Sequence, residues 1–480
     1  MGNTSFSASG TACAGVARLH PSTSLGMSLL GLFFSIFLLL PAAAQERVPL
    51  PPQTAGLAWP MAGWQTGVMT PDEAAKVQPL IDKAMAGRLE DTMGETRAVV
   101  IVHHGRLVAE AYADGFGRDT KQISWSMAKS ITSALVGRAV QLGLIDDLDA
   151  PMPSPFDEGD PRARITWRQW LNMTDGLDYN EMSEPSLMKN DVVQMMYGRG
   201  RFDVMQYIKD ELPPVHPPGT VWNYSTAAFH LIGRALEQVS SQNMRIGRFG
   251  PFAPEDAEAA RALRLRMEAG EDTEALRNEI RQLTEKSLAA AQIQKKGGFL
   301  AAPEPSPKSV FSIWVDDVLF APLGMDAQIE FDSAGTYLGG SLVWASARDF
   351  AKFGYLYLRD GVWEGERLLP EGWVDFSRTD PPETEATVYG AGFWLTPETP
   401  VPASQGAHSP PYDSFSAQGH EGQTIWIVPS RDLVIVRLGL MGEGDGNWPA
   451  LVEWNQEIAR AFPASAIPEG SAGQAAPNGL

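Results

Sequence analysis

A serine and a lysine stand three residues apart at Ser126 and Lys129, in the pattern Ser-x-x-Lys. In a helix this spacing puts both side chains on one face, one turn apart. An amine beside a hydroxyl can take its proton and create a nucleophile, provided that burial lowers the pKa of the amine. The free N–H groups at a helix start would then stabilise an oxyanion. The alternative for Ser126 is a plain helix N-cap beside a solvated lysine.

A second Ser-x-x-Lys, from Ser186 to Lys189, shows that the pattern alone is weak evidence. The helical context separates the two copies, because apolar residues recur on one face only after Ser126. These apolar residues are Ile131, Ala134, Leu135, Ala139 and Leu142. They predict a helix over 126–142 that Gly143 ends.

Tyr224 lies in a short loop that follows a Pro-Pro-Gly turn at 217–219 and precedes a predicted helix at 227–240. A phenol held beside a lysine can act as a general acid or base. The alternative is a ring that packs under the turn.

Residues 418–423 (Gln-Gly-His-Glu-Gly-Gln) precede an apolar strand predicted at 423–428. The two glycines leave room for a backbone to approach a ligand. His420 can hold a substrate carboxylate or polarise a carbonyl, and the alternative is a histidine in a turn. If this strand lies alongside the helix, the main-chain N–H of Gln423 joins that of Ser126 in an oxyanion hole.

The helices and strands that must position these residues follow an order typical of a fold in which helices pack against one sheet. The predicted helices lie at 73–86, 126–142, 227–240, 347–359 and 448–462. The predicted strands lie at 98–102, 107–113, 391–395, 423–428 and 433–440. This order predicts an α+β fold in which both ends of the chain complete one antiparallel sheet, with a helical lobe inserted between them.

The composition excludes several classes of protein. With 480 residues, of which 44% are hydrophobic, the chain has ample material for a large core. Its 58 acidic against 38 basic residues give a net charge of −20, which opposes binding to nucleic acid. No His-Glu-x-x-His motif or cysteine cluster occurs, so no metal or other cofactor is expected. The absence of Gly-x-Ser-x-Gly excludes the usual α/β-hydrolase nucleophile.

The N-terminus has the layout of a secretory signal. An apolar run at 29–40 precedes an Ala-x-Ala site, so we expect a signal peptide over 1–44 that is cleaved after Ala44. This predicts a periplasmic or secreted protein without a membrane span after cleavage; the alternative is an uncleaved anchor. Met27 is a second candidate start. Cleavage would remove Cys13, the single cysteine, and with it any disulfide or thiol nucleophile.

The rest of the chain divides by composition. Residues 45–94 are expected to form a strap and a helix, and 95–462 the main domain. Within it, the charged, Ala-rich stretch 244–307 predicts an inserted helical hairpin, either a lid or partner surface or a solvated decoration. Residues 463–480 predict a disordered tail.

Taken together, these segments resemble the serine β-lactamase-related hydrolases of the penicillin-recognising superfamily. The resemblance is closest to the class C β-lactamase and esterase branch, and especially to 6-aminohexanoate-dimer hydrolases. The family motifs Ser-x-x-Lys, Tyr-x-Asn and Lys-Thr-Gly correspond to Ser126–Lys129, Tyr224–Thr226 and His420–Gly422. Further similar stretches, which extend the resemblance over most of 95–460, lie at 165–177, 321–325 and 339–353.

The resemblance implies a β-lactamase-like fold and acyl transfer through a covalent acyl-serine. It makes Ser126 the nucleophile and gives Lys129 and Tyr224 the proton transfers. The expected oxyanion and substrate contacts come from Ser126, Gln423, His420, Gly422 and Thr226.

Two departures from the family pattern bear on the substrate. Thr226 replaces the usual asparagine and His420 replaces the usual lysine, which favours an esterase or amidase over a potent β-lactamase. The remaining alternatives are a D-alanyl peptidase, a β-lactamase, and a non-catalytic protein that senses peptides or lactams. In each case we expect a small ester, amide or peptide ligand; the oligomeric state is left open.

Overall fold

The computed structural model describes residues 48–181, 186–243, 309–381, 389–395, 413–441 and 448–464, together with Arg266, Ala275 and Glu279. The chain divides into two compact units, Met1–Gln45 and Glu46–Leu480, and every element below belongs to the second. The predicted leader and almost all of the predicted tail lie outside the described residues. So does the predicted insertion, apart from three helical residues, of which Arg266 and Glu279 form an ion pair of 2.9 Å.

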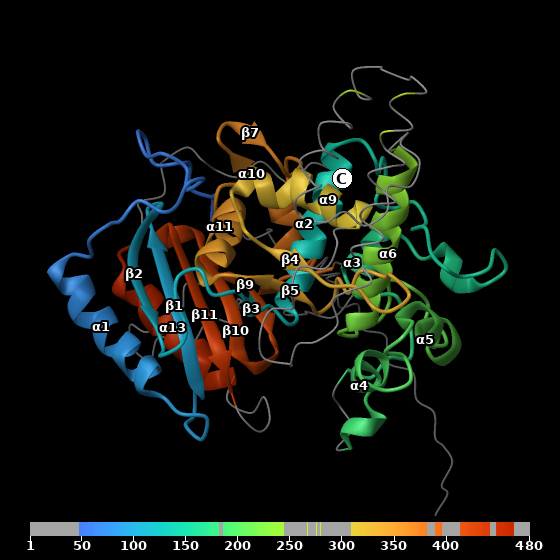
Figure 1. Ribbon diagram of the computed structural model, residues 1–480, viewed down its shortest axis with the longest axis horizontal. Helices are drawn as coiled ribbons and strands as arrows, with labels where there is room; N and C mark the ends of the chain where they lie inside the picture. The colour runs from blue at the N-terminus through green and yellow to red at the C-terminus, as the bar shows by residue number, and fades with distance from the viewer. Residues whose placement is uncertain are drawn as a thin grey trace, which may run out of the picture. The chain divides into compact units, whose positions relative to one another are not determined.

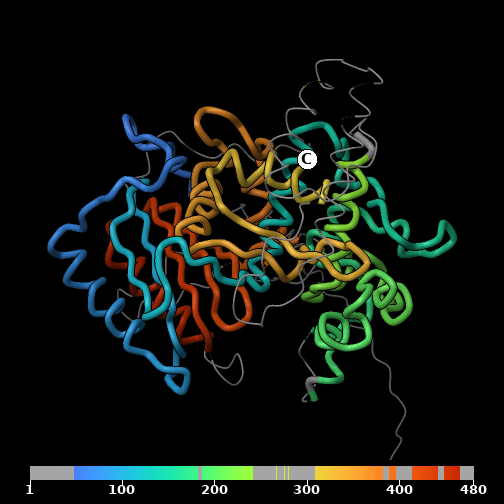
Figure 2. Tube along the Cα trace, in the orientation of Figure 1, coloured from blue at the N-terminus to red at the C-terminus, as the bar shows by residue number. Residues whose placement is uncertain are grey.

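A six-stranded antiparallel sheet forms the centre of the second unit (Figure 1). Its order is β2-β1-β11-β10-β9-β8. The strands are β1 (Glu95–His103), β2 (Arg106–Tyr112), β8 (Trp394–Leu395), β9 (Phe415–Gly419), β10 (Gln423–Val428) and β11 (Leu433–Leu440). In the register, β1 pairs with β11 from Glu95 opposite Leu440 to His103 opposite Leu433. The sheet is therefore completed by both ends of the chain, as Figure 2 also shows, and the predicted α+β fold is confirmed.

Both faces of the sheet are covered, which explains why β1 is apolar along its whole length. Alternate residues of a strand point to opposite faces. Val99 and Ile101 join the core beneath α1 (Pro71–Ala86) and α13 (Trp448–Ala461). On the other face, Val100 joins the larger core beneath α11 (Ala347–Leu358).

Helix α2 (Met127–Gln141) is the central helix of the larger core, and its first thirteen residues are all buried. It packs against α6 (Thr226–Asn243) and against β9. Close packing depends on a glycine: a Cβ atom at Gly137 would lie 2.8 Å from the Trp373 ring. A helix fixed on all sides holds the residue before its first turn, Ser126, in one place beside the sheet.

The remaining described elements surround this core. The short helices are α3 (Trp167–Leu171), α4 (Asp191–Met196), α5 (Val204–Glu211), α9 (Val310–Val315), α10 (Ala321–Leu323) and α12 (Trp373–Ser377). Smaller sheets are built from β3 (Gln122–Ile123), β5 (Val343–Ala345) and β4 (Gln328–Ile329), and from β6 (Val362–Trp363) and β7 (Glu366–Arg367). Within the described ranges, no helix has both the length and the apolar character needed to cross a membrane.

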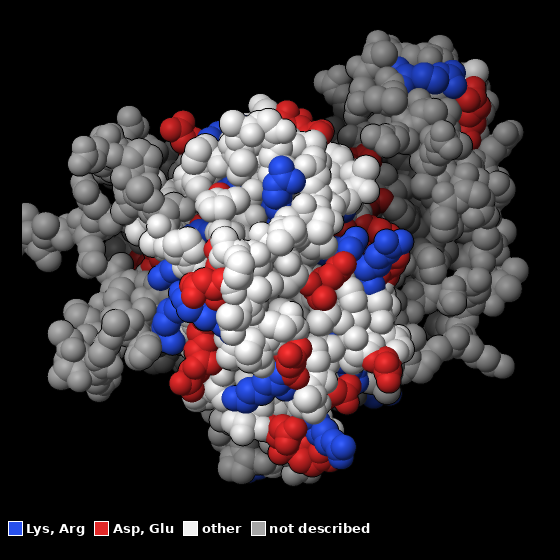
Figure 3. Space-filling model, turned by 90° about the vertical axis from the view of Figure 1, so that its left-hand side faces the viewer, with Lys and Arg blue, Asp and Glu red and all other residues white. Residues whose placement is uncertain are grey.

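The surface around α1 mixes acidic and basic side chains, as the view onto this side shows (Figure 3). Lys76 and Asp72, for example, pair at 2.6 Å on the exposed face of α1. An exposed pair of this kind contributes only about 0–1 kcal/mol to stability. The fold therefore depends on the two apolar cores, and the surface charges add little to it.

Two strand predictions differ from the structure. The predicted strand at 391–395 is shortened to β8, because Gly392 takes a left-handed backbone with φ of 92°. Strand β9 was not predicted at all. Its apolar alternation is limited to Phe415 and Ala417, which join the larger core, and so short a pattern did not stand out in the sequence.

Candidate active site

Ser126 directly precedes α2, and its hydroxyl does not cap the helix. The oxygen instead accepts a hydrogen bond from Lys129 Nζ at 2.9 Å. The preceding residue, Trp125, takes a left-handed backbone with φ of 45°, which is uncommon for a residue with a large side chain. The plain N-cap alternative for Ser126 is therefore not what the geometry shows.

Lys129 is completely buried, and its amine has three hydrogen-bond partners. Besides Ser126 Oγ, it donates to Thr226 Oγ1 and to the Gly340 carbonyl, both at 2.8 Å. Burial lowers the pKa of Lys129 to about 8, because a charged ammonium is poorly solvated in the interior. At that pKa, about a tenth of the amine is neutral at pH 7 and able to accept a proton.

Tyr224 reaches the same place from the loop before α6. The centre of its ring lies 4.8 Å from Lys129 Nζ. The ring stacks on Trp394 at 5.3 Å and meets the edge of Tyr389 at 5.7 Å, which fixes its plane. The structure thus brings together the hydroxyl, the amine and the phenol ring that the sequence separates by about a hundred residues.

Thr226, the first residue of α6, is buried behind Lys129 and is not placed for contact with a substrate. Its hydroxyl accepts from Lys129 and donates to Glu181 Oε1 at 2.7 Å. Its main-chain N–H donates to Glu181 Oε2 at 3.0 Å. These positions give Thr226 a role in orienting Lys129, where the sequence suggested a substrate contact.

Sequence reasoning missed Glu181. The residue lies in a loop between α3 and α4, forty-five positions before its partner Thr226, so no spacing rule connects the two. The only signal was its place four residues after the stretch 165–177, which resembles the family.

Both β9 and β10 contact α2, and the end of β9 lies against the residues that precede this helix. A Cβ atom at Gly419 would lie 2.2 Å from the Ser124 carbonyl and 3.2 Å from the Ser126 nitrogen. Gln423 pairs with Gly419 from the next strand, and its side-chain amide binds the Gly439 carbonyl at 2.6 Å. The predicted position of Gln423 beside Ser126 needs correction, because the unpredicted strand β9 occupies that position.

The other two residues of the predicted substrate contact lie in the turn between β9 and β10. The His420 side chain is 45% exposed and meets the Trp125 ring edge-on at 5.5 Å. Gly422 is buried, and a Cβ atom there would lie 2.7 Å from Nη1 of Arg437. The structure therefore places His420 beside the residue before Ser126, and Gly422 against a buried arginine.

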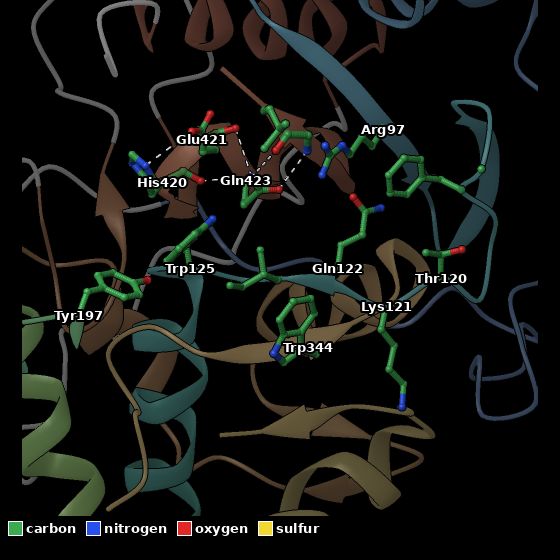
Figure 4. Close-up of a pocket in the computed structure, with 15 residues that line it drawn as sticks. Arg97, Thr120, Lys121, Gln122, Trp125, Tyr197, Trp344, His420, Glu421 and Gln423 are labelled. Atoms are coloured by element: carbon green, nitrogen blue, oxygen red, sulfur yellow. Dashed lines mark hydrogen bonds and ion pairs between the residues drawn. The ribbon is translucent and has the colours of Figure 1, made fainter. Parts of the chain in front are cut away.

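A cavity of about 770 Å³ opens beside the Trp125–His420 pair (Figure 4). Its apolar walls include Phe116 and Trp344. Gln122 is buried and extends into the cavity, and its Nε2 has no hydrogen-bond partner within the described part of the chain. The cavity thus reaches Trp125, the residue before Ser126, while Ser126, Lys129 and Tyr224 are not among the residues that line it.

The second Ser-x-x-Lys does not form a buried serine–lysine pair at the start of a long helix. Ser186 is exposed, and Lys189 is exposed on a single 3-10 turn, Leu187–Lys189. The helical context thus distinguished the two copies correctly.

Comparisons with known proteins agree with this architecture. Residues 81–249 match the family model described as Beta-lactamase. An uncharacterized protein of Alkalihalophilus pseudofirmus is 31% identical over 98 residues, which are 20% of this chain. The chain spans 29% of the length of that curated relative.

Two solved structures are similar to this chain at low identity, and the first shows the same fold. One is titled "Putative 6-aminohexanoate-dimer hydrolase from Bacillus anthracis"; it is 17% identical, and the match covers 86% of this chain and 90% of that one with a TM-score of 0.54. A beta-lactamase from Mycobacterium bovis is 15% identical over 80% of this chain and 100% of that one, with a TM-score of 0.46. Residues 81–249 of this chain thus match the beta-lactamase family, and the chain has a β-lactamase-like fold.

Proposed function

We propose that this protein hydrolyses an ester or amide through a covalent acyl-serine on Ser126. The observation that carries the proposal is the buried amine of Lys129, 2.9 Å from the Ser126 hydroxyl. A desolvated lysine with a pKa of about 8 is able to serve as a general base near neutral pH.

In the acylation step, neutral Lys129 takes the Ser126 proton while Oγ attacks the substrate carbonyl carbon. The oxyanion is received by the main-chain N–H of Ser126 and by an N–H at the end of β9, where His420 follows Gly419. The bond to the leaving group then breaks, and the leaving group takes the proton from Lys129, either directly or through Tyr224.

In the deacylation step, a water molecule attacks the acyl carbon and gives its proton to Lys129, either directly or through Tyr224, which passes on its own proton as it receives one. The bond from Ser126 Oγ to the acyl carbon breaks, and Lys129 returns a proton to Oγ. The acid product leaves, and the enzyme regains its starting state.

We take the cavity beside Trp125 as the site of the substrate's acyl group, and its lining favours a neutral group. Arg97 and Lys121 line it, but each is already paired with a carboxylate, of Glu95 and Asp326 respectively, and Glu421 also lines it. A histidine at position 420 offers less to an anionic lactam carboxylate than the lysine of the family motif, which is ordinarily charged near neutral pH.

The proposal is tested by a hydrolysis panel that compares wild type with Ser126→Ala. The substrates are short aryl esters, the 6-aminohexanoate dimer, a chromogenic cephalosporin and a D-Ala-D-Ala peptide. We expect turnover of an ester or amide that Ser126→Ala abolishes and that Ser186→Ala, in the other Ser-x-x-Lys, leaves unchanged. Turnover that survives Ser126→Ala would contradict the proposal, and stoichiometric acylation without turnover would favour a sensing protein.

A further inference from the structure

The Glu181 carboxylate holds one end of a hydrogen-bond chain that ends at Ser126. Its two oxygens accept from the main-chain N–H and the hydroxyl of Thr226, at 3.0 and 2.7 Å. The same hydroxyl oxygen lies 2.8 Å from Lys129 Nζ, which lies 2.9 Å from Ser126 Oγ. The chain of contacts therefore runs from Glu181 through Thr226 and Lys129 to Ser126.

The direction of each hydrogen bond in this chain follows from the donors and acceptors available. An ionised carboxylate only accepts, so the single hydrogen of the Thr226 hydroxyl points to Glu181. The Thr226 oxygen can then only accept from Lys129. The Gly340 carbonyl, at 2.8 Å from Nζ, also only accepts.

This direction decides where a neutral Lys129 amine presents its lone pair. A neutral amine has two hydrogens, and the Thr226 oxygen and the Gly340 carbonyl each require one. The lone pair is then left facing the third neighbour, the Ser126 hydroxyl. Without the carboxylate, the Thr226 hydroxyl is free to turn its hydrogen toward that lone pair and to occupy it.

We propose that Glu181 is a positioning residue, which acts through the Thr226 hydroxyl to aim the lone pair of Lys129 at Ser126. The inference rests on the proposed function, since it assigns to Glu181 the orientation of the proposed base. Glu181 touches neither Ser126 nor the reacting atoms in this arrangement.

The charge of Glu181 also acts on Lys129. Among the described residues, it is the charged group that raises the pKa of Lys129 against the larger effect of burial. The other titratable groups nearby are Tyr224, whose ring faces Nζ, and His230, whose pKa burial lowers to about 3 and which is therefore neutral near pH 7. Tyr179 interacts with Glu181 and Thr226, and Tyr389 lies against Tyr224; burial raises the pKa of both phenols well above the ordinary value, so both are neutral in the pH range of interest. Loss of the Glu181 charge must therefore lower the pKa of Lys129.

The test measures the rate at which a fluorophosphonate probe labels Ser126 between pH 5.5 and pH 10. We expect Glu181→Gln to lower the plateau rate on the order of tenfold to a hundredfold, because an amide offers a single acceptor oxygen to the two Thr226 donors and its NH2 group competes for the Thr226 hydroxyl oxygen. We also expect the midpoint of the acidic limb to move down by about 1 pH unit, because the carboxylate charge is gone. A residue that only supports the fold would not move this midpoint.

Three further variants separate the orientation of the Lys129 lone pair, the charge of Glu181 and a general effect on the stability of the protein. Glu181→Asp keeps the charge with a shorter reach, so it should lower the plateau and leave the midpoint near that of wild type. Thr226→Val removes the hydroxyl through which Glu181 acts, so it should lower the plateau although the carboxylate is still present. Glu371→Gln removes an exposed carboxylate elsewhere and should change neither quantity.

The outcomes distinguish the inference from the proposed function. Labelling by Glu181→Gln with the wild-type plateau and midpoint would overturn the inference alone. If Glu181→Gln does not fold, Glu181→Asp decides instead: a wild-type plateau would overturn the inference. If wild type itself is labelled no faster than Ser126→Ala, the proposed function fails, and the inference fails with it.

Discussion

At the scale of single residues, the chemistry depends on a lysine that the fold keeps out of water. Lys129 has no exposed surface, and burial brings its pKa down to about 8 from an ordinary value near 10.5. Lowering the pKa means that protonation of the amine is less favourable in the folded state. The rate of acylation should therefore rise with pH up to about 8 and level off above it, since only the neutral amine accepts the Ser126 proton.

Removing this amine should be far more damaging than removing a lysine elsewhere. We expect Lys129→Met to slow acylation of Ser126 by about 10² to 10⁴, the usual contribution of a general base. Lys189→Met is the matched control, because it removes the lysine of the exposed Ser-x-x-Lys. Stopped-flow or gel-based labelling rates measure both variants, and equal rates for the two would show that Lys129 is not the base.

The sequence predicted Ser126 and Lys129 because their spacing has a physical meaning in a helix. Glu181 has no such spacing to its partner Thr226 and was missed for that reason. Only the folded chain shows that two loops distant in sequence meet behind the lysine.

At the scale of elements, the close contact between β9 and the start of α2 builds the site. Gly419 lies so close to Ser124 and Ser126 that even a methyl group would collide with the Ser124 carbonyl, at 2.2 Å. Gly419→Ala should therefore move β9 away from Ser126 and weaken the oxyanion hole. The removal of one such donor costs about 3 kcal/mol of barrier in known enzymes, a factor of about a hundred in rate.

The control is Gly159→Ala, where an added Cβ atom meets nothing within 4 Å. Labelling rates at a pH above 8 and thermal unfolding by circular dichroism should be measured for both variants. We expect normal behaviour for Gly159→Ala, and slow labelling with a loss of stability of about 1–3 kcal/mol for Gly419→Ala. Unchanged labelling by Gly419→Ala would show that β9 does not contribute to the site.

The helices and central strands were predicted from apolar periodicity, and β9 was not because only Phe415 and Ala417 give it an apolar face. The strand is held by backbone pairing with its two neighbours, β10 and β8, so two apolar residues are enough. The error had a direct consequence: with β9 overlooked, Gln423 was assigned to the position that the end of β9 holds.

At the scale of the whole molecule, residues from both ends of the chain must meet before the site exists. The pairing of β1 with β11 joins the two ends, and α13 covers one face of the sheet that results. The three largest buried side chains of α13 in that core are Leu451, Trp454 and Ile458. Burial of such side chains contributes about 1.5–3 kcal/mol each, a large part of a domain's usual stability of about 5–15 kcal/mol.

A chain that ends at residue 447 should therefore unfold at a much lower temperature or fail to remain soluble. A chain that ends at residue 464, which lacks only the predicted disordered tail, should melt like the full chain. Thermal unfolding by circular dichroism checks both truncations. Identical melting of the shorter chain would contradict the assigned role of α13. The predicted leader over 1–44 lies outside the described residues, and export stays a prediction.

The most direct measurement is mass spectrometry of the protein after reaction with a fluorophosphonate, at a series of pH values. The account predicts one adduct per chain, carried by the peptide that contains Ser126, and formed with a midpoint near pH 8. An adduct on another residue, or a rate of formation at Ser126 that does not change with pH or with loss of Lys129, would contradict it.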